Sequence, residues 1–279
     1  MHDRIALSAC IITFNEADRI GDCLDSLRFC DEIVVIDSGS SDDTVALCEA
    51  RGARVLQRPF DGFQAQKQFA VSQARFDWIL SLDADERISP ELAASIDAER
   101  RRGFPASGYR FNRLSSYFGR FLRHGNAYPD RQLRLFDRRQ ARWNAHRQVH
   151  ERVQSDGEVR HLKGNLIHYP YRSLSQLLSK KQHYARLMAE HDHRRGKRAR
   201  LSKLVLAPLW RFLRGYVLRR GFLDGWPGLI EALVSAGYVA QKTQMLWLLE
   251  HGQPLVDPPR ATATPNPPAG LPVPHTATR

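Results

Sequence analysis

Three carboxylates stand close together directly after a hydrophobic segment of the sequence. In WILSLDADER, five residues suited to a buried strand precede Asp83, Asp85 and Glu86. Like charges so close together repel each other, so a positive partner is expected there. A divalent cation bound by Asp83 or Asp85 would offset the repulsion, because Mg²⁺ and Mn²⁺ usually take one or two carboxylates together with substrate phosphates. The spacing predicts a metal and phosphate site. Glu86 is left without an assigned role, and the simplest interpretation is that it only caps or solvates the start of the next segment.

The first hundred residues alternate between strand-like and helix-like patterns. Compact apolar runs predict four strands, and segments with apolar residues at helical spacing separate them. The predicted strands are ALSACIIT (6–13), EIVVID (32–37), ARVLQ (53–57) and WILSLD (78–83). Four strand–helix repeats predict an α/β fold in which helices cover both faces of a mostly parallel sheet.

Acidic and amide side chains lie at the ends of three of these strands. Asn15 and Glu16 come after the first, Asp37 ends the second, and Asp83 and Asp85 belong to the fourth. Each residue alone would be explained as a turn former or a helix cap. Ligands of parallel α/β sheets bind at the carboxyl ends of the strands, so together these residues indicate one shared site.

The rest of the chain has a different composition. After Gly103 the segments are shorter and more polar, which is consistent with mixed strands and loops added to the first unit. Helical spacing predicts helices at 173–195, 201–218 and 227–249. The last 27 residues, from Gln253, contain eight prolines with Ala and Thr, a composition that cannot form a packed core and predicts disorder.

Charge is unevenly distributed. The net charge is +12, but residues 1–100 carry −9 and the remaining 179 carry +21. Residues 172–220 hold 14 Lys and Arg against two acidic residues, which suits nucleic acid or anionic lipid headgroups. The apolar stretches there do not reach the about 20 residues needed to span a bilayer. Trp, Phe and Leu beside Arg and Lys instead predict binding at an anionic membrane surface through residues 180–220. Packing onto the rest of the chain and homo-oligomer formation are the alternatives.

Three motifs in the first hundred residues resemble a known family in their order, spacing and strand context. TFNEADRIGDCLDSL, VVIDSGSSDDT and WILSLDADE resemble the family 2 glycosyltransferases of the nucleotide-diphospho-sugar transferase fold, also called GT-A. The resemblance implies that Asp83 and Asp85 form a D-x-D motif that binds the donor diphosphate through Mg²⁺ or Mn²⁺. It assigns direct metal coordination to Asp85 and places Asp83 nearer the ribose.

The resemblance also assigns the donor pocket. Asp37 corresponds to the carboxylate that contacts the nucleotide base, and Lys67 supplies a positive charge where many relatives carry an Arg in the third helix. The residues implied in donor binding are Thr13, Asn15, Glu16, Asp37, Lys67 and Asp83.

Later motifs narrow the resemblance to a subfamily. NAYPDRQLRLFDRR, QVHERV and FLDGWPGLIEALVSAGYV resemble the inner-core lipopolysaccharide β-1,4-glucosyltransferases that act on the first heptose. The resemblance implies a UDP-sugar donor whose sugar is glucose, and a lipid A-core oligosaccharide acceptor. Glu151 is the first choice for the catalytic base and Asp130 is the rival, while Arg131, Arg134 and His150 are expected to contact the diphosphate or the acceptor.

These inferences divide the chain into four parts. Residues 1–103 form the nucleotide-sugar-binding half of the GT-A domain, 104–172 the acceptor-binding half, 173–252 a membrane-associated region of basic amphipathic helices, and 253–279 a tail. The four cysteines show no C-x-x-C spacing and no signal peptide opens the chain, so we expect reduced thiols in a cytoplasmic protein. The basic helices and the acceptor implied by the resemblance predict a peripheral location on the inner face of the cytoplasmic membrane.

Two other functions fit part of the sequence. The same fold could transfer sugar to a polyprenyl phosphate or another surface glycan. A basic nucleic-acid-binding protein would explain the positive second half. The acidic rim and the lack of a recognisable nucleic-acid module oppose that function, so no nucleic-acid partner is expected.

Overall fold

A nine-stranded mixed sheet forms the centre of the computed structural model, which describes residues 4–143 and 152–255. Its strands run in the order β3-β2-β1-β4-β8-β6-β11-β5, with β7 paired to β6. The strands are β1 (Leu7–Thr13), β2 (Glu32–Asp37), β3 (Arg54–Gln57), β4 (Trp78–Asp83), β5 (Glu86–Ile88), β6 (Gly108–Tyr117), β7 (Arg120–Phe121), β8 (Asp130–Asp137) and β11 (Val159–His168). A separate hairpin pairs β9 (Ala141–Trp143) with β10 (Val153–Ser155).

The first half of the sheet is parallel and has helices on both faces. β1 lies between β2 and β4, and every residue of β1 is buried, which is why its sequence is a continuous apolar run. One core cluster joins β1 to α1 and α4, and a second joins the sheet to α3. The helices of this half are α1 (Ile20–Asp25), α2 (Thr44–Glu49), α3 (Phe63–Gln73) and α4 (Pro90–Arg101). The predicted α/β fold with a mixed, mostly parallel sheet is confirmed.

The second half of the sheet brings β5 back toward β4. β8 is antiparallel to both β4 and β6, β6 and β11 are parallel, and β5 pairs with β11 at the edge. Only Ala84 and Asp85 lie between β4 and β5, so the connection spans at most about 11 Å. In a flat sheet the four strand spacings between β4 and β5 would measure about 19 Å. The sheet must therefore curl, and β4 and β5 are in contact.

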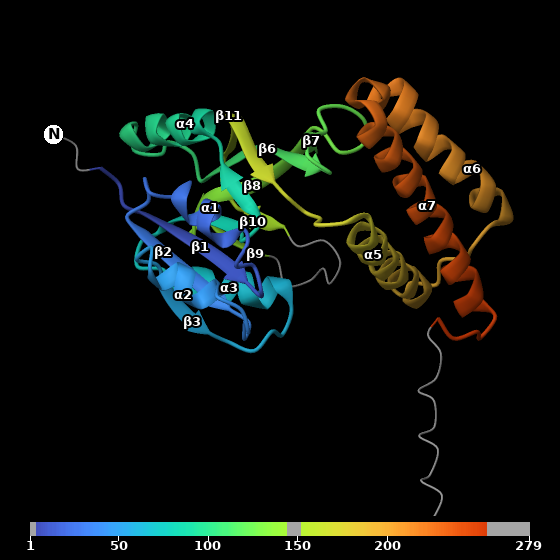
Figure 1. Cartoon of the computed structure of the whole chain (residues 1–279), viewed down its shortest axis with the longest axis horizontal. Helices are drawn as coiled ribbons and strands as arrows, with labels where there is room; N and C mark the ends of the chain where they lie inside the picture. Colours follow the sequence, from blue (N-terminus) through green and yellow to red (C-terminus); the bar gives the residue numbers. More distant parts are fainter. Residues whose placement is uncertain (1–3, 144–151, 256–279) are drawn as a thin grey trace, which may run out of the picture.

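Three long helices form a layer beside the sheet. α7 (Gly225–Glu250) packs between α5 (Leu174–Arg194) and α6 (Leu201–Phe212), and α6 is the helix farthest from the sheet (Figure 1). A π-helical segment, η1 (Leu213–Leu218), continues α6, and a 3₁₀ turn, η2 (Gly221–Asp224), leads into α7. These bounds agree closely with the predicted helices. Within the described residues, none of the helices combines the length and the apolar character that crossing a membrane would require.

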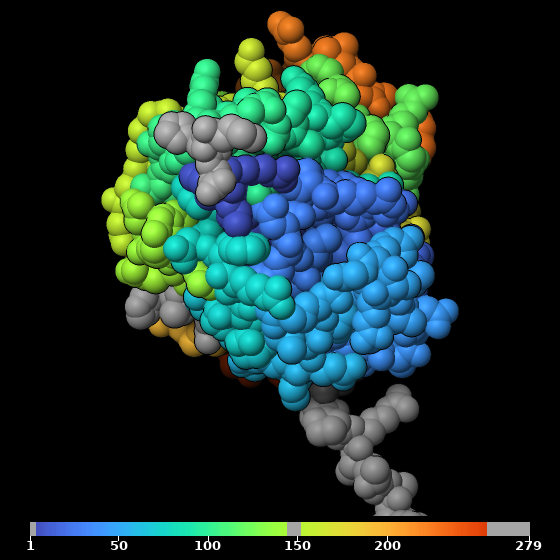
Figure 2. Space-filling model, turned by 90° about the vertical axis from the view of Figure 1, so that its left-hand side faces the viewer, coloured from blue at the N-terminus to red at the C-terminus, as the bar shows by residue number. Residues whose placement is uncertain are grey.

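The amino ends of the parallel strands lie on the side away from the three helices. In the space-filling view of that side, residues of the first hundred, coloured blue to teal, form most of the surface (Figure 2). The carboxyl ends, where the sequence places the site, therefore lie on the side of the sheet that faces α5.

Candidate active site

Asp83, the last residue of β4, lies between two cationic side chains. Its Oδ1 is 2.9 Å from Lys67 Nζ, and its Oδ2 accepts a hydrogen bond from Arg134 Nη2 at 3.0 Å. Lys67 comes from α3 and Arg134 from β8, and both are buried. Burial favours the neutral form of Asp83, but the charges of Lys67 and Arg134 outweigh it and hold the pKa of this carboxyl well below its usual range. Asp83 is therefore a fixed anion.

Glu86, the first residue of β5, is a fully buried carboxylate. Its Oε2 accepts the backbone N–H of Asp83 at 3.0 Å, and its Oε1 lies 3.2 Å from Arg134 Nη2 and 3.3 Å from Arg113 Nη1. The expectation that Glu86 only caps or solvates the next segment is wrong. Because β5 pairs with β11 inside the curl, this carboxylate is carried into the protein, where two guanidinium groups balance its charge.

The charges at this rim alternate in sign along one chain of contacts. Neighbouring members lie between 2.7 and 3.3 Å apart, and each contact joins a carboxylate to a cation. We name this set the charge chain; it runs Lys67, Asp83, Arg134, Glu86, Arg113, Asp130. The charge chain connects the predicted donor carboxylate Asp83 to Asp130, one of the two predicted bases. Gln132 Nε2 also donates to Asp130, at 2.6 Å.

Asp85 lies next to an imidazole that the sequence analysis did not single out. Its Oδ2 is 3.5 Å from Nε2 of His168, the last residue of β11, and Nδ1 of His168 is 3.1 Å from Ser115 Oγ. Burial favours the neutral form of Asp85, but the contact with His168 outweighs it and lowers the pKa of the carboxyl. The position of His168 at the carboxyl end of β11 is typical of a site residue, but the partner Asp85 is not indicated by any residue near it in the sequence.

The donor set of Asp85 and His168 fits a divalent cation. Mg²⁺ and Mn²⁺ are commonly bound by one or two protein groups together with substrate phosphates and water, and imidazole nitrogen is an accepted ligand of transition metals. Among residues 4–143 and 152–255, no three His, Cys, Asp or Glu side chains converge closely enough to hold a metal by themselves. A metal at Asp85 would thus need ligands from the substrate.

The loops after β1 and β2 are tied together through Asp37. Its Oδ2 accepts the backbone N–H groups of Gly39 and Ser40, both at 2.9 Å. Ser40 Oγ donates to Asp37 and accepts the backbone N–H of Asn15 at 2.8 Å. Asn15 has a left-handed backbone (φ 53°), which asparagine tolerates better than most residues, and its Oδ1 accepts Ser41 N–H at 2.8 Å. The two predicted donor residues therefore shape this rim.

Glu16 connects the first loop to the segment that leads into α5. Its Oε2 is 2.6 Å from Arg172 Nη2, and the same nitrogen is 2.6 Å from Asp18 Oδ1. A second hydrogen bond connects the same two segments: Arg19 Nη1 donates to the Tyr169 carbonyl at 2.5 Å. Burial raises the pKa of Glu16, and the charge of Arg172 offsets this only in part.

Some buried groups near the rim, Thr13 and Arg134 among them, have donors without a partner among the described residues. Thr13 Oγ1 is buried at the end of β1 and makes no hydrogen bond within the structure. Arg134 Nε and Nη1 are likewise unpartnered, and the guanidinium lies 5.6 Å from the centre of the Trp143 ring. Buried polar groups are rarely left unsatisfied, so Thr13 and Arg134 are positions where a ligand would gain hydrogen bonds.

Comparisons with known proteins identify the family of the chain. The model of the family described as glycosyl transferase family 2 matches residues 8–151. The lipopolysaccharide core biosynthesis glycosyltransferase LpsC of Rhizobium meliloti (strain 1021) is 34% identical over 251 residues, which cover 85% of this chain and 90% of LpsC. The chain belongs to glycosyl transferase family 2.

The chain is also similar to another relative in sequence and to a solved structure. An uncharacterised glycosyltransferase of Rickettsia felis is 32% identical to this family 2 glycosyltransferase over 82% of the chain and 85% of its own length. Among solved structures, residues 1–349 of S. aureus TarS match with a TM-score of 0.45 and 15% identity, over 91% of this chain and 95% of that one.

Arg131 of the glycosyltransferase takes no part in the charge chain. Arg131 is exposed, and no ion pair joins it to an acidic residue in the described part of the chain. Burial, together with the positive charges of Arg131 and Arg110, lowers the pKa of His161. Glu151 and His150 lie outside the described residues, so their roles stay predictions. The assignments of Thr13, Asn15, Glu16, Asp37, Lys67, Asp83, Asp85, Asp130 and Arg134 also stay predictions, now with the contacts given above.

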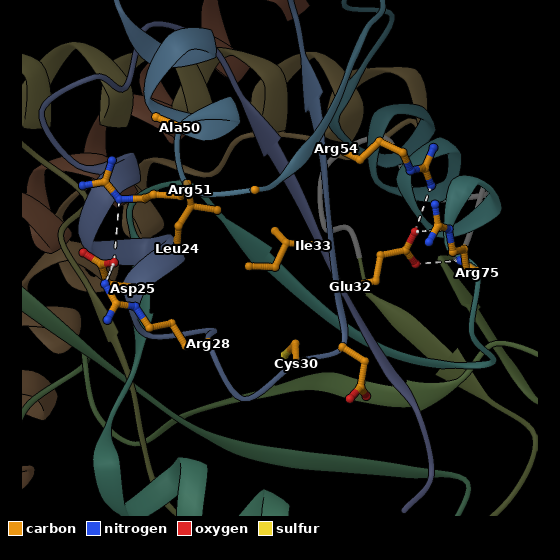
Figure 3. A pocket seen from close by; sticks show the side chains of 12 residues that line it. Leu24, Asp25, Arg28, Cys30, Glu32, Ile33, Ala50, Arg51, Arg54 and Arg75 are labelled. Carbon is orange, nitrogen blue, oxygen red and sulfur yellow. Dashed lines mark hydrogen bonds and ion pairs between the residues drawn. The ribbon is translucent and has the colours of Figure 1, made fainter.

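A cavity of about 650 Å³ lies away from this rim, at the amino ends of β2 and β3. Each of its four cations already has an acidic partner: Arg54 and Arg75 both contact Glu32, and Arg28 and Arg51 both contact Asp25 (Figure 3). The cavity also lies away from the carboxyl ends of the strands, so the charge chain remains the better candidate for the chemistry of this glycosyltransferase.

Proposed function

We propose that this enzyme is an inverting, metal-dependent glycosyltransferase that moves a hexose, glucose, from a UDP-sugar to the heptose region of the lipopolysaccharide inner core. The name of LpsC, to which the chain is similar over most of both lengths, supports an acceptor in lipopolysaccharide core biosynthesis. The observation that carries the proposal is the approach of Asp85 to His168 at 3.5 Å beside the charge chain. A carboxylate oxygen and an imidazole nitrogen beside fixed cations support a metal-bound diphosphate at this position.

The donor would bind across the carboxyl ends of β1, β2 and β4. Asp37 and Asn15 shape the loops that would hold the nucleoside, and Thr13 offers a buried hydroxyl without a protein partner. Asp85 and His168 would hold Mg²⁺ or Mn²⁺, which when bound neutralises charge on the diphosphate. Asp83, fixed by its two cations, would face the ribose.

The transfer needs one proton acceptor from this chain. In an inverting reaction the acceptor hydroxyl attacks the anomeric carbon from the face opposite the nucleoside diphosphate, and a base takes its proton. Such a base contributes typically ~10²–10⁴-fold to the rate. We assign this role to Glu151, with Asp130 as the rival. Arg134, His150 and Arg131 are proposed to contact the diphosphate or the acceptor.

The acceptor sets the proposed location of the enzyme. A lipid A-core oligosaccharide is anchored in a membrane, so an enzyme that modifies it would work at the inner face of the cytoplasmic membrane. The exposed basic residues of α5 and α6 would favour an anionic membrane surface there.

Calorimetric titration with UDP in the presence and absence of Mn²⁺ tests the donor site. We expect wild type to bind UDP more tightly with Mn²⁺ and Asp85→Ala to lose that difference. Asp97→Ala, an acidic residue of α4 away from the rim, should behave as wild type. Binding of UDP that is independent of metal and survives Asp85→Ala would refute the metal site, and salt-sensitive DNA binding without UDP binding would favour a nucleic-acid function.

Mass spectrometry of the lipopolysaccharide core from a deletion strain tests the acceptor. Loss of one hexose from the inner core is expected. An unchanged core would contradict the assigned acceptor and direct attention to a polyprenyl phosphate or another surface glycan.

A further inference from the structure

Helix α6 presents large apolar side chains to the surroundings. None of its residues is buried, although most of them are apolar. Leu201 is 75% exposed, Val205 66% and Trp210 58%, and Leu206 and Leu209 are also more than half exposed. Leu201, Val205 and Leu209 are spaced four residues apart, which places them along one stripe of the helix. An apolar stripe of this kind normally packs against another surface.

The exposed apolar surface continues beyond α6. η1 contacts both α6 and η2, and η2 contacts α7, so the exposed residues of these elements adjoin each other. The further members are Leu213, Val217, Leu218, Phe222, Leu223 and Trp226. We call this set, from Leu201 to Trp226, the α6–η2 surface. Exposed apolar patches formed from several adjacent elements usually mark an interaction site.

Unpaired cations border the α6–η2 surface. Lys203, Arg214, Arg219 and Arg220 are exposed, and within the described residues none of them forms an ion pair with an acidic side chain. The sequence contains no Asp or Glu between Leu201 and Leu223. Apolar side chains, including tryptophan, next to unpaired Lys and Arg match what the interface of an anionic bilayer requires.

We propose that the α6–η2 surface inserts into the headgroup region of an anionic phospholipid bilayer and holds the enzyme on it without crossing it. This inference rests on the proposed function in one respect: it identifies the surface at which a lipid-anchored acceptor would be met. α6 is the outermost helix and is separated from α5 by α7, so the surface is free to lie flat on a membrane (Figure 1).

A second copy of the chain is a less suitable occupant. A symmetric dimer presents the same patch on both subunits, so it would bring the cationic border of the α6–η2 surface against itself. Repulsion between these like charges would oppose the contact, whereas anionic headgroups would neutralise the same charges.

Sedimentation of the full chain with vesicles tests the proposal. Wild type should bind vesicles that contain phosphatidylglycerol more strongly than vesicles of phosphatidylcholine alone. The double variants Leu209→Glu/Trp210→Glu and Arg214→Glu/Arg219→Glu should each bind the anionic vesicles on the order of tenfold more weakly. Phe60→Glu is the matched control, because Phe60 is 51% exposed but lies after β3, and it should bind as wild type. Circular dichroism checks that each variant is folded.

Two results would overturn the proposal. One is equal vesicle binding by wild type and both double variants. The other is a wild-type dimer that the apolar double variant dissociates, with no vesicle binding by either, which would assign the surface to a second copy. UDP titration of the same samples separates this inference from the proposed function: intact UDP binding without vesicle binding refutes only the membrane surface, and vesicle binding without UDP binding refutes only the donor site.

Discussion

His168 Nε2 lies 3.5 Å from Asp85 Oδ2, although the two residues lie far apart in the sequence. Pairing of β11 with β5 brings them together, since His168 is in register with Glu86, the residue after Asp85. Ser115 Oγ contacts the other ring nitrogen and fixes the orientation of the imidazole. A D-x-D carboxylate therefore acquires a nitrogen neighbour only when the sheet has curled.

His168→Ala should weaken the Mn²⁺-dependent part of UDP binding by on the order of tenfold or more, because the proposed metal site would lose its nitrogen ligand beside Asp85. Calorimetric titration with and without Mn²⁺ measures this difference. His161→Ala is the matched control, since His161 lies on the same strand but beside Arg131 and Arg110. An unchanged Mn²⁺ effect in His168→Ala would exclude the imidazole as a ligand.

Glu86→Gln should destabilise the fold by about 3–5 kcal/mol, since it leaves the buried Arg134 and the half-buried Arg113 with too little negative charge. The free energy of unfolding in urea measures the loss. Glu91→Gln, at an exposed position of α4, should change it by less than about 0.5 kcal/mol. Equal stability of the two variants would mean that the buried contacts of Glu86 contribute nothing to folding.

Asp83 gives a stability contribution with a defined pH dependence. Its pKa is lower in the folded chain than the ordinary value of 3.8, so the ionised form stabilises the fold at neutral pH. The contribution is fully present above about pH 4 and is lost as the pH falls through the folded-state pKa. The difference in unfolding free energy between wild type and Asp83→Asn should be constant from about pH 7 to pH 5 and shrink below about pH 4. A difference that disappears already near neutral pH would contradict the lowered pKa.

Thr13→Val should act in opposite directions on stability and on donor binding. Its hydroxyl is buried without a partner, so a methyl group of similar shape should leave the free energy of unfolding unchanged or raise it by up to about 1 kcal/mol. If the donor meets this hydroxyl, UDP affinity should fall.

Thr44→Val provides the contrast. Thr44 Oγ1 donates to Asp42 and accepts the backbone N–H of Glu16, so this change should lower stability by about 1–3 kcal/mol. Denaturation and UDP titration of both variants check the pair. Lower stability of Thr13→Val, with UDP binding unchanged, would assign Thr13 a purely structural role.

Much of the fold could be predicted because its signals are local. The apolar runs of β1, β2 and β4 and the spacing of α5 to α7 are visible in short windows of sequence. The position of Asp83 and Asp85 followed from the end of such a run. All four cysteines are free, as expected.

The parts that sequence reasoning missed depend on distant pairing. The sequence around Glu86 is typical of an exposed strand start, and only the β5–β11 contact buries Glu86 between Arg113 and Arg134. His168 ends a strand like many others, and nothing near it in the sequence indicates that Asp85 lies opposite. No pattern within a short window could have shown either result.

The short connection between β4 and β5 also sets the order of events during synthesis. β4 can pair with β1 early, but β5 has no partner until β11 has left the ribosome. A nascent chain that ends before Val159 would contain every predicted donor-binding residue and still lack the β5–β11 pairing that brings His168 to Asp85 and buries Glu86. This part of the rim would thus appear late, as one of the final steps of chain folding rather than as a property of its amino-terminal half.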